Sequence, residues 1–214
     1  MISVTFSDVI FSAIWNIGLI IETVFSLGMY LIFLYNLFDL YITVEKMKDL
    51  LVQDLNKDPL TNVYNRRYLS IIYNKLKDEV NNIYPITVMM LDIDHFKKIN
   101  DEFGHNSGDA VLVSLASVLV SNLNPQGVVI RTGGEEFFIL LPGVNQGMAV
   151  KVADNLMNII RGLPLINGMH KISVSIGIYS TVDFSYLTDC MAKADEALYK
   201  AKKAGRDRTC IFYE

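Results

Sequence analysis

The first 45 residues of the chain contain no lysine or arginine, and Lys46 is the first basic residue. Cysteine is also scarce, because Cys190 and Cys210 are the only two and they lack the spacing of metal ligands. We therefore expect reduced, buried thiols rather than a cysteine-based metal site. The net charge of −4 leaves no basic excess, which argues against a nucleic-acid partner.

What the N-terminal segment does contain is a long apolar run. Between Glu22 and Asp39 the residues are apolar, aromatic or weakly polar, slightly short of the ~20 residues that cross a bilayer. Both acids can lie at the interfaces and complete the length, and Trp15 and Tyr41 suit interfacial positions. We therefore expect residues 1–45 to form a membrane-spanning segment. No basic leader region or small-residue cleavage site is present, so we do not expect a removed signal peptide.

The orientation of this segment follows from its charges. Basic residues occur only on its C-terminal side, so the positive-inside rule places the rest of the chain in the cytoplasm. The expected location is the inner (cytoplasmic) membrane, with membrane lipid as a partner of the N-terminal segment. Two alternatives remain open. A second, outer helix over residues 6–21 would reverse the orientation, and the segment could instead be an apolar dimerisation helix outside any membrane.

Apolar residues at spacings of three and four continue beyond the apolar run. They are Leu37, Leu40, Val44, Met47 and Leu51. This spacing is typical of the seam of a parallel two-stranded coiled coil, and also of an amphipathic helix that lies on a domain. We expect a helical connector over residues 46–57 that ends near Pro59, because proline disfavours helix in the residue before it.

The remaining residues, 58–214, predict an α+β domain. Helices are expected over residues 65–80, 145–161 and 188–204, and a further helix is expected to begin at Ser107 as its N-cap. Strands are expected over residues 86–92, 128–130, 137–141, 171–179 and 209–213. Gly205 is the expected end of the last helix. Helices and strands that interleave around an antiparallel hairpin indicate a ferredoxin-like sheet.

The hairpin turn carries two glycines followed by two carboxylates, at residues 133–136. A glycine pair between two apolar runs is a hairpin signal, and glycine also lets a phosphate approach the backbone closely. Taken alone, the pattern is equally that of an ordinary hairpin with a charged edge.

Further acids follow the expected strand over residues 86–92. Asp92 and Asp94 lie where that strand should end, and Lys97 and Lys98 follow. Carboxylates from a strand end and a neighbouring hairpin form an oxygen-rich site. Mg²⁺ prefers such a site, usually completed by waters and substrate phosphates. The two lysines could neutralise further phosphate oxygens.

Several separate motifs, in the right order, resemble the GGDEF family of diguanylate cyclases. They are Asp58-Pro59-Leu60-Thr61, Asn65-Arg66-Arg67, residues 92–109, Gly133-Gly134-Glu135-Glu136-Phe137, Val174-Ser175-Ile176-Gly177 and residues 194–206. The resemblance runs from Asp58 to the C-terminus, about three quarters of the chain. It implies a palm-type, ferredoxin-like GGDEF domain with a central antiparallel sheet. A transmembrane helix and a short coiled-coil connector would precede that domain.

The resemblance also implies an activity. The chain would condense two GTP molecules into cyclic di-GMP and release two pyrophosphates, with Mg²⁺, or Mn²⁺, as the cofactor. Because each site holds one GTP, two sites must face each other, and a homodimer is expected. The alternative is a catalytically weak GGDEF domain that serves as a GTP-binding sensor or as a membrane interaction module.

Single residues take their expected roles from the same resemblance. The catalytic residues would be Glu135, as the general base, and Lys97, which would stabilise charge on the phosphates. The implied metal ligands are Asp92, the carbonyl of Ile93, Glu135 and Glu136. Asp94 is left out of this set, because a structural role is at least as plausible.

The substrate contacts implied by the resemblance are backbone amides near Phe96 together with Lys202 and Arg206 for the triphosphate, Asn100 and Asp109 for guanine, and His105 for the nucleotide. A carboxylate can accept two hydrogen bonds from guanine N1–H and N2–H₂, a pattern that adenine does not offer. Two alternatives stay open. Lys202 and Arg206 could be a basic helix end favoured by the helix dipole, and His105 could be structural.

One feature of many family members is missing. An Arg-x-x-Asp product-inhibition motif commonly precedes the glycine pair, and here that window contains Asn124-Pro125-Gln126-Gly127. We therefore expect no feedback inhibition through that site.

Overall fold

The computed structural model describes residues 6–78, 84–123, 127–163, 171–182 and 186–213. The chain divides after Leu55 into two compact units, and each is described by itself.

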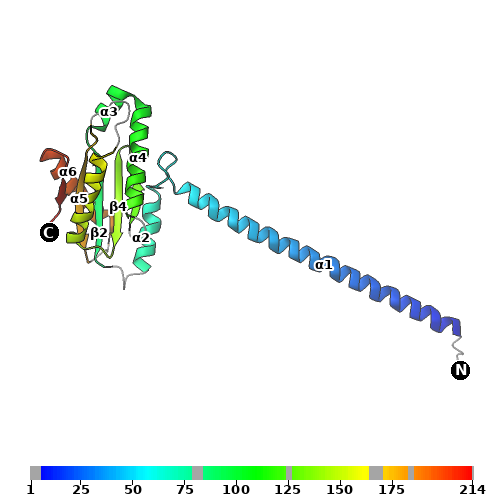
Figure 1. Cartoon of the computed structure of the whole chain (residues 1–214). Coiled ribbons are helices and arrows are strands. Elements are labelled where there is room, and N and C mark those ends of the chain that lie inside the picture. Colours follow the sequence, from blue (N-terminus) through cyan, green and yellow to red (C-terminus); the bar gives the residue numbers. More distant parts are fainter. Residues whose placement is uncertain (1–5, 79–83, 124–126, 164–170, 183–185, 214) are drawn as a thin grey trace. The chain divides into compact units, whose positions relative to one another are not determined.

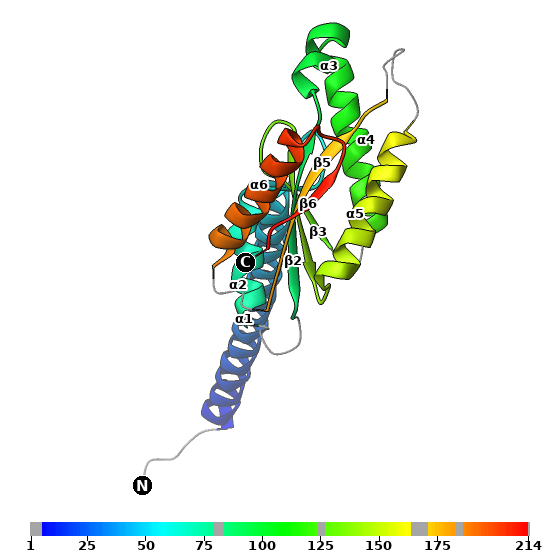
Figure 2. The same cartoon turned by 90° about the vertical axis from the view of Figure 1, so that its left-hand side faces the viewer.

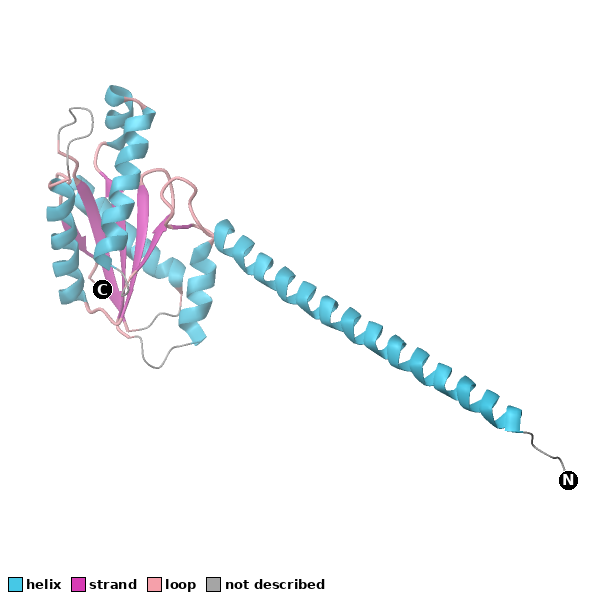
Figure 3. Cartoon of the chain, turned by 45° about the vertical axis from the view of Figure 1, so that its right-hand side comes forward, coloured by secondary structure: helices cyan, strands magenta, loops and turns pink. Residues whose placement is uncertain are grey.

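The first unit is one continuous helix, α1 (Phe6–Leu55), of 50 residues (Figures 1 and 3). Large apolar side chains are exposed at consecutive positions, for example from Leu31 to Leu34. Since consecutive residues point about 100° apart around a helix, the apolar surface surrounds it. The helix has no break near residue 21 that would separate an outer helix over 6–21. Among the described residues, one helix is long and apolar enough to cross a membrane, over Ala13–Lys48 with a mean hydropathy of 2.1.

The second unit is built on a six-stranded sheet of order β1-β3-β4-β2-β5-β6. The strands are β1 (Tyr64–Asn65), β2 (Ile86–Ile93), β3 (Val128–Arg131), β4 (Glu136–Pro142), β5 (Val174–Thr181) and β6 (Thr209–Ile211). The inner strands β3, β4, β2 and β5 are antiparallel neighbours, as predicted. The edge strands β1 and β6 pair in parallel, so the sheet is mixed. β5 begins at Val174 rather than Lys171, and β6 ends at Ile211 rather than Tyr213.

Helices cover both faces of this sheet (Figure 2). On one face, α2 (Tyr68–Asp78) and α6 (Leu187–Lys203) share a core with Val88 of β2. On the other face, α4 (His105–Leu123) and α5 (Gln146–Arg161) share a core with Met89, the next residue of β2. Successive strand residues point to opposite faces, so a strand covered on both sides is nearly continuously apolar. All eight residues of β2 are buried. A short turn after Ile93 connects this strand to α3 (Phe96–Phe103).

The predicted start of the first helix of this unit is wrong. The helix expected from Asn65 begins at Tyr68, because Asn65 belongs to β1, where it pairs with Arg131. Its carboxamide accepts the amide of Arg67 at 2.9 Å and donates to the carbonyl of Lys57 at 3.0 Å. These bonds hold Asn65 in a turn ahead of the helix. The predicted end at residue 80 lies outside the described residues.

Ser107 is not an N-cap, contrary to prediction. It is buried inside α4, and its hydroxyl donates to the carbonyl of Phe103 at 2.8 Å. The break between α3 and α4 lies instead at Gly104, whose φ of 81° an L-residue adopts only at a cost. The helix therefore starts at His105, two residues earlier than the hydroxyl suggested.

The end of α6 agrees with prediction. Gly205 follows the helix with a φ of 113°. Its amide donates to the carbonyl of Lys202 at 3.4 Å, and the amide of Arg206 donates to the carbonyl of Ala201 at 3.1 Å. This pair of bonds is the Schellman arrangement that closes a helix at a glycine.

Candidate active site

Carboxylates gather at the end of β2. Asp92 is 5% exposed and lies opposite Glu136, the first residue of β4, while Glu135 immediately precedes that strand. Burial raises the pKa of Glu135, and the negative charge of Asp92 raises it further. Lys202 opposes this shift, and Glu136 adds to it. The strand end and the hairpin therefore form one acidic site, as the sequence predicted.

Lys202, near the end of α6, brings a positive charge to this site. Its Nζ lies 2.7 Å from Oδ2 of Asp92. Burial raises the pKa of Asp92, whereas the hydrogen bond and charge of Lys202 lower it, and the net shift is upward. The structure thus pairs Lys202 with a candidate metal ligand, where the sequence predicted a triphosphate contact.

Arg131, at the end of β3, holds the turn that carries Glu135. Its Nε and Nη2 donate to the carbonyl oxygen of Gly134 at 3.1 and 2.7 Å. Its Nη1 forms an ion pair with Oδ1 of Asp58 at 2.9 Å. The same carboxylate accepts the amide of Thr61 at 2.9 Å and its hydroxyl at 2.6 Å. The turn before the candidate general base is therefore tied to the first residues of the second unit.

Asp94 lies two residues after Asp92, where its charge raises the pKa of Asp92, and it takes part in a set of structural hydrogen bonds. Its carboxylate accepts the hydroxyls of Ser173 and Ser175, each at 2.7 Å, and the amide of Asp207 at 2.9 Å. It is 6% exposed. These contacts support the structural role expected for Asp94.

The helices α3 and α4 bring together the two expected guanine contacts. Asn100 of α3 lies so close to Gly108 of α4 that a Cβ on the glycine would overlap the Asn100 carboxamide. Asp109 follows Gly108 and is exposed. Asn100 therefore lies against the residue that precedes Asp109.

The other predicted contacts come from α3, from the start of α4 and from the turn after α6. Phe96 begins α3 and is buried, while Lys97 on that helix and His105 at the start of α4 are exposed. Arg206 follows α6, and its charge lowers the pKa of Asp92. Within the described parts of the chain, neither Lys97 nor His105 forms a hydrogen bond to another site residue.

A comparison with known proteins decides what this arrangement is. The family described as "Diguanylate cyclase, GGDEF domain" matches residues 55–208. The chain belongs to the GGDEF family. It is 30% identical over 204 residues to the "Probable diguanylate cyclase DgcT" of Escherichia coli (strain K12), which covers 92% of this chain and 43% of that protein. The chain thus spans less than half the length of that relative.

Solved GGDEF domains share the fold. The "active GGEEF domain of a diguanylate cyclase from Vibrio cholerae" matches with a TM-score of 0.64 and 33% identity, over 70% of this chain and 97% of that one. The GGDEF domain of DgcB from Caulobacter crescentus, solved in complex with c-di-GMP, matches with a TM-score of 0.69 and 28% identity, over 75% and 94%. The second unit therefore has the palm-like α+β fold of this family.

The acidic site of the GGDEF domain has a donor set that fits a divalent cation shared with a substrate. Within the described residues, no three Asp, Glu, His or Cys side chains form a complete metal site. Mg²⁺ usually takes only one or two carboxylates, and waters and substrate phosphates supply its other ligands. Asp92 and Glu135, with the carbonyl of Ile93 at the end of β2, match that requirement.

Sequence reasoning gave no role to two residues that shape this site, Gly108 and Arg131. The signal for Gly108 was a glycine directly before an expected guanine contact. The signal for Arg131 is an arginine two positions before the glycine pair. Neither signal identifies the partner, because Asn100 and Asp58 come from other elements.

Replacing Gly108 by alanine is expected to weaken nucleotide binding through Asn100. The added Cβ would displace the Asn100 carboxamide and lie 3.2 Å from the Phe96 ring. Loss of about one hydrogen bond should raise the KM for GTP about tenfold with a smaller effect on kcat. Steady-state kinetics measure this. Gly147→Ala is the matched control, since a Cβ there meets its nearest neighbour at 3.6 Å. An unchanged KM would show that GTP binding does not require the Asn100 carboxamide to lie against Gly108.

Asp58 should make the stability of the second unit depend on pH. Burial alone would raise the pKa of Asp58, but hydrogen bonds from Thr61 and Arg131 outweigh it, so the folded pKa lies below the ordinary 3.8. The folded state thus favours the ionised form. The stabilisation is complete above about pH 4 and is lost as the pH falls through the folded pKa.

Asp58→Asn is therefore expected to lower the free energy of unfolding by about 1 kcal/mol at pH 7 and by progressively less below pH 4. Urea unfolding of the intact chain and of the variant at pH 7 and pH 3 measures both differences. An equal difference at the two pH values would contradict the ionic role of Asp58.

Proposed function

We propose that the chain is a diguanylate cyclase that joins two molecules of GTP into cyclic di-GMP and releases two pyrophosphates. The observation that carries this proposal is the acidic site of a GGDEF domain, in which Glu135 lies beside Asp92, itself paired with Lys202. In each half-reaction a ribose 3′-hydroxyl of one GTP attacks the α-phosphate of the other. One O–P bond forms, the bond to pyrophosphate breaks, and the hydroxyl proton leaves.

The acidic residues hold the reacting groups in this scheme. Asp92, the carbonyl of Ile93 and Glu135 would hold Mg²⁺ or Mn²⁺, with Glu136 beside a second ion. Such a cation neutralises phosphate charge and lowers the pKa of the attacking hydroxyl when it is bound. Glu135 takes the proton of that hydroxyl. A carboxylate at the edge of a partly buried turn can serve this purpose without large movement.

Basic groups and amides hold the triphosphate. Lys97 and Arg206 supply positive charge from α3 and from the turn after α6. Lys202 exchanges its 2.7 Å contact with Asp92 for a phosphate oxygen when the nucleotide binds. Backbone amides at the start of α3, near Phe96, face the β- and γ-phosphates, where the N-terminus of a helix favours an anion.

The guanine base is held by Asn100 and Asp109, and His105 lies at the start of the same helix as Asp109. Asp109 accepts hydrogen bonds from guanine N1–H and N2–H₂. ATP lacks those donors and would leave the carboxylate unpaired, so ATP should be rejected.

Catalysis requires two copies of the chain, because each site holds one GTP and the product contains two. We infer a homodimer in which two GGDEF domains face each other. Residues 46–57, as a helical connector in a parallel two-stranded coiled coil, would raise the effective concentration of one domain near the other.

The N-terminal segment, residues 1–45, anchors the enzyme in the inner (cytoplasmic) membrane in this proposal. Within the described residues, no part of the 36-residue window Ala13–Lys48 is buried. That window is about 54 Å long as a helix, longer than the ~30 Å hydrocarbon core, so one span leaves part of the helix outside the core. Lys46 and Lys48 follow the apolar run and keep that side, with the GGDEF domain, in the cytoplasm.

The direct test is to incubate the intact chain, reconstituted in lipid nanodiscs, with GTP and Mg²⁺ and to identify the products by mass spectrometry. We expect cyclic di-GMP and two pyrophosphates for each product molecule, and no reaction with ATP or in the presence of EDTA. Binding of GTP without product would instead favour the alternative, a sensor or membrane interaction module built on the same domain.

Feedback inhibition is expected to be absent at the usual position. Residues 124–126 of the window that lacks Arg-x-x-Asp lie outside the described residues, so this expectation depends on the sequence. Adding cyclic di-GMP to the steady-state assay should leave the rate nearly unchanged. Strong noncompetitive inhibition would contradict it.

A further inference from the structure

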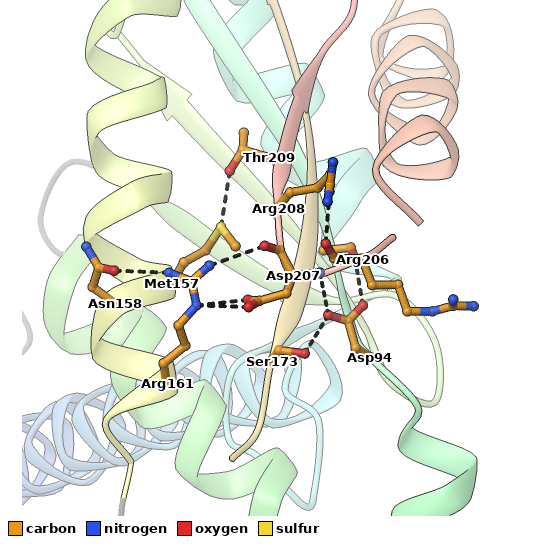
Figure 4. Close-up of polar contacts among 10 residues, drawn as sticks. Asp94, Met157, Asn158, Arg161, Ser173, Arg206, Asp207, Arg208 and Thr209 are labelled. Atoms are coloured by element: carbon orange, nitrogen blue, oxygen red, sulfur yellow. Dashed lines mark hydrogen bonds and ion pairs between the residues drawn. The ribbon is translucent and has the colours of Figure 1, made fainter. Parts of the chain in front are cut away.

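The turn after α6 has an unusual backbone. Gly205, Arg206 and Asp207 have consecutive positive φ angles of 113°, 60° and 46°. Glycine adopts such angles readily and aspartate more often than most residues, but two consecutive non-glycine residues at positive φ are rare and require support from their surroundings. Asp207 is held by contacts from outside the turn, which Figure 4 draws.

The first of these contacts comes from Asp94, just beyond β2. The amide of Asp207 donates to Oδ2 of Asp94 at 2.9 Å. Asp94 is itself fixed by the hydroxyls of Ser173 and Ser175, each at 2.7 Å. Asp94 is only 6% exposed, so little water competes for its carboxylate. Hydrogen bonds to an ionised carboxylate are also stronger than those between neutral groups.

The second contact comes from Arg161, the last residue of α5. Its Nε donates to both carboxylate oxygens of Asp207, at 2.9 and 3.2 Å, and its Nη2 donates to the Asp207 carbonyl at 3.2 Å. Its Nη1 donates to Oδ1 of Asn158 at 3.1 Å, which fixes the guanidinium on α5. The side chain and the backbone of Asp207 are thus both held by one planar group.

The Arg206 side chain points elsewhere. Figure 4 shows it extending away from Asp207 and Arg161, which lie on the other side of the turn. The charge of Arg206 acts on Asp92, at the acidic site. The contacts of Asp94 and Arg161 with Asp207, called the clamp below, therefore hold the residue that follows Arg206 in the chain.

We propose that Arg161 and Asp207 are positioning residues that hold the left-handed turn and so direct Arg206 at the nucleotide triphosphate. The inference rests on the proposed function, in which Arg206 contacts the triphosphate. Neither Arg161 nor Asp207 touches the substrate. Both act through Arg206, with Asp94 as the fixed anchor on the side of β2.

A double-mutant cycle on GTP affinity tests whether Arg161 acts through Arg206. The intact chain, Arg161→Ala, Arg206→Ala and the double variant are titrated with GTP and with guanosine. Loss of the phosphate contact in Arg206→Ala should raise the Kd for GTP about tenfold. Arg161→Ala should raise it about fivefold, as expected for a partly exposed pair. The double variant should match Arg206→Ala, and no variant should change the Kd for guanosine.

Three further variants distinguish the loss of the clamp contacts from the loss of one positive charge and from disruption of the turn backbone. Lys151→Ala removes one positive charge from an exposed position of α5 and should leave the Kd for GTP unchanged. Arg161→Lys keeps the charge but cannot reach both the carboxylate and the carbonyl of Asp207, so it should behave nearly as Arg161→Ala does. Asp207→Asn should weaken GTP binding less, since asparagine tolerates positive φ and retains the amide bonded to Asp94.

Additive losses of GTP affinity in the double variant would overturn the proposal, as would an Arg161→Ala variant with an unchanged Kd for GTP. An equal loss of guanosine binding would also overturn it, because it would indicate general unfolding. The proposed function fails separately, if the unaltered chain binds GTP but makes no cyclic di-GMP, and the cycle of Kd values remains decisive in that event.

Discussion

Glu135→Gln is expected to lower the rate of cyclic di-GMP formation about a thousandfold, the typical contribution of a general base. Glutamine has nearly the same size but cannot accept the hydroxyl proton and is a weaker metal ligand. The affinity for GTP should be largely kept, because Asn100, Asp109 and Lys97 lie on other elements. Product formation and the Kd for GTP are measured on the same preparation.

The matched control for this variant is Glu102→Gln, which makes the same chemical change on the exposed surface of α3. Its rate should stay within about twofold of the unaltered chain, as is usual for surface substitutions. A Glu135→Gln variant that keeps a tenth of the rate would show that another group takes the proton. A variant that loses GTP binding or dimerisation would indicate a structural role for Glu135 instead.

Gly177→Ala is expected to destabilise residues 56–214 by about 3 kcal/mol, at the upper end of the cost of overpacking a core. A Cβ on Gly177 would overlap the Ala194 carbonyl oxygen and the Leu198 amide, and it would lie 2.8 Å from the Cα of Leu198. These are backbone atoms of α6, which cannot rotate away, so the helix must move off β5. Since α6 carries Lys202, GTP affinity should fall as well.

Thermal unfolding measures this effect, and a loss of about 3 kcal/mol corresponds to a Tm lower by about 10 °C for a unit of this size. Gly147→Ala, in the first turn of α5, is the control. Its Cβ would meet only Asn145 Oδ1 at 3.6 Å, and alanine favours helix more than glycine does, so its Tm should be equal or higher. If both variants unfold at the same temperature, α6 does not pack on Gly177 as closely as described.

Much of the site could be predicted because its main parts are local in sequence. Asp92 lies near the end of a strand whose other residues are apolar except for Thr87, and Glu135 follows directly on a glycine pair between two apolar runs. Strand ends and hairpin turns are recognisable from such short patterns. The antiparallel pairing of the two neighbouring strands then brings the two acids together.

The partners of these residues could not be predicted in the same way. Arg131 meets Asp58 across 73 positions of sequence, and the Asp207 amide meets Asp94 across 113. Arginine and aspartate are common residues, one of the donors is a backbone amide, and periodicity carries no information on which of these groups meet. Ser107 is a similar case, since a serine near a helix start is also able to bond to the preceding turn.

The sequence by itself determined the long apolar helix, the buried central strand, the acidic hairpin and the closure of α6 at Gly205, because each depends on composition or spacing within about one element. The tertiary structure decided the parallel edge strands β1 and β6, the pairing of Lys202 with Asp92, and the clamp of Asp94 and Arg161 on Asp207. Those features depend on which distant segments pack together. That choice is made by the burial of whole helices and strands, and the patterns within single elements do not record it.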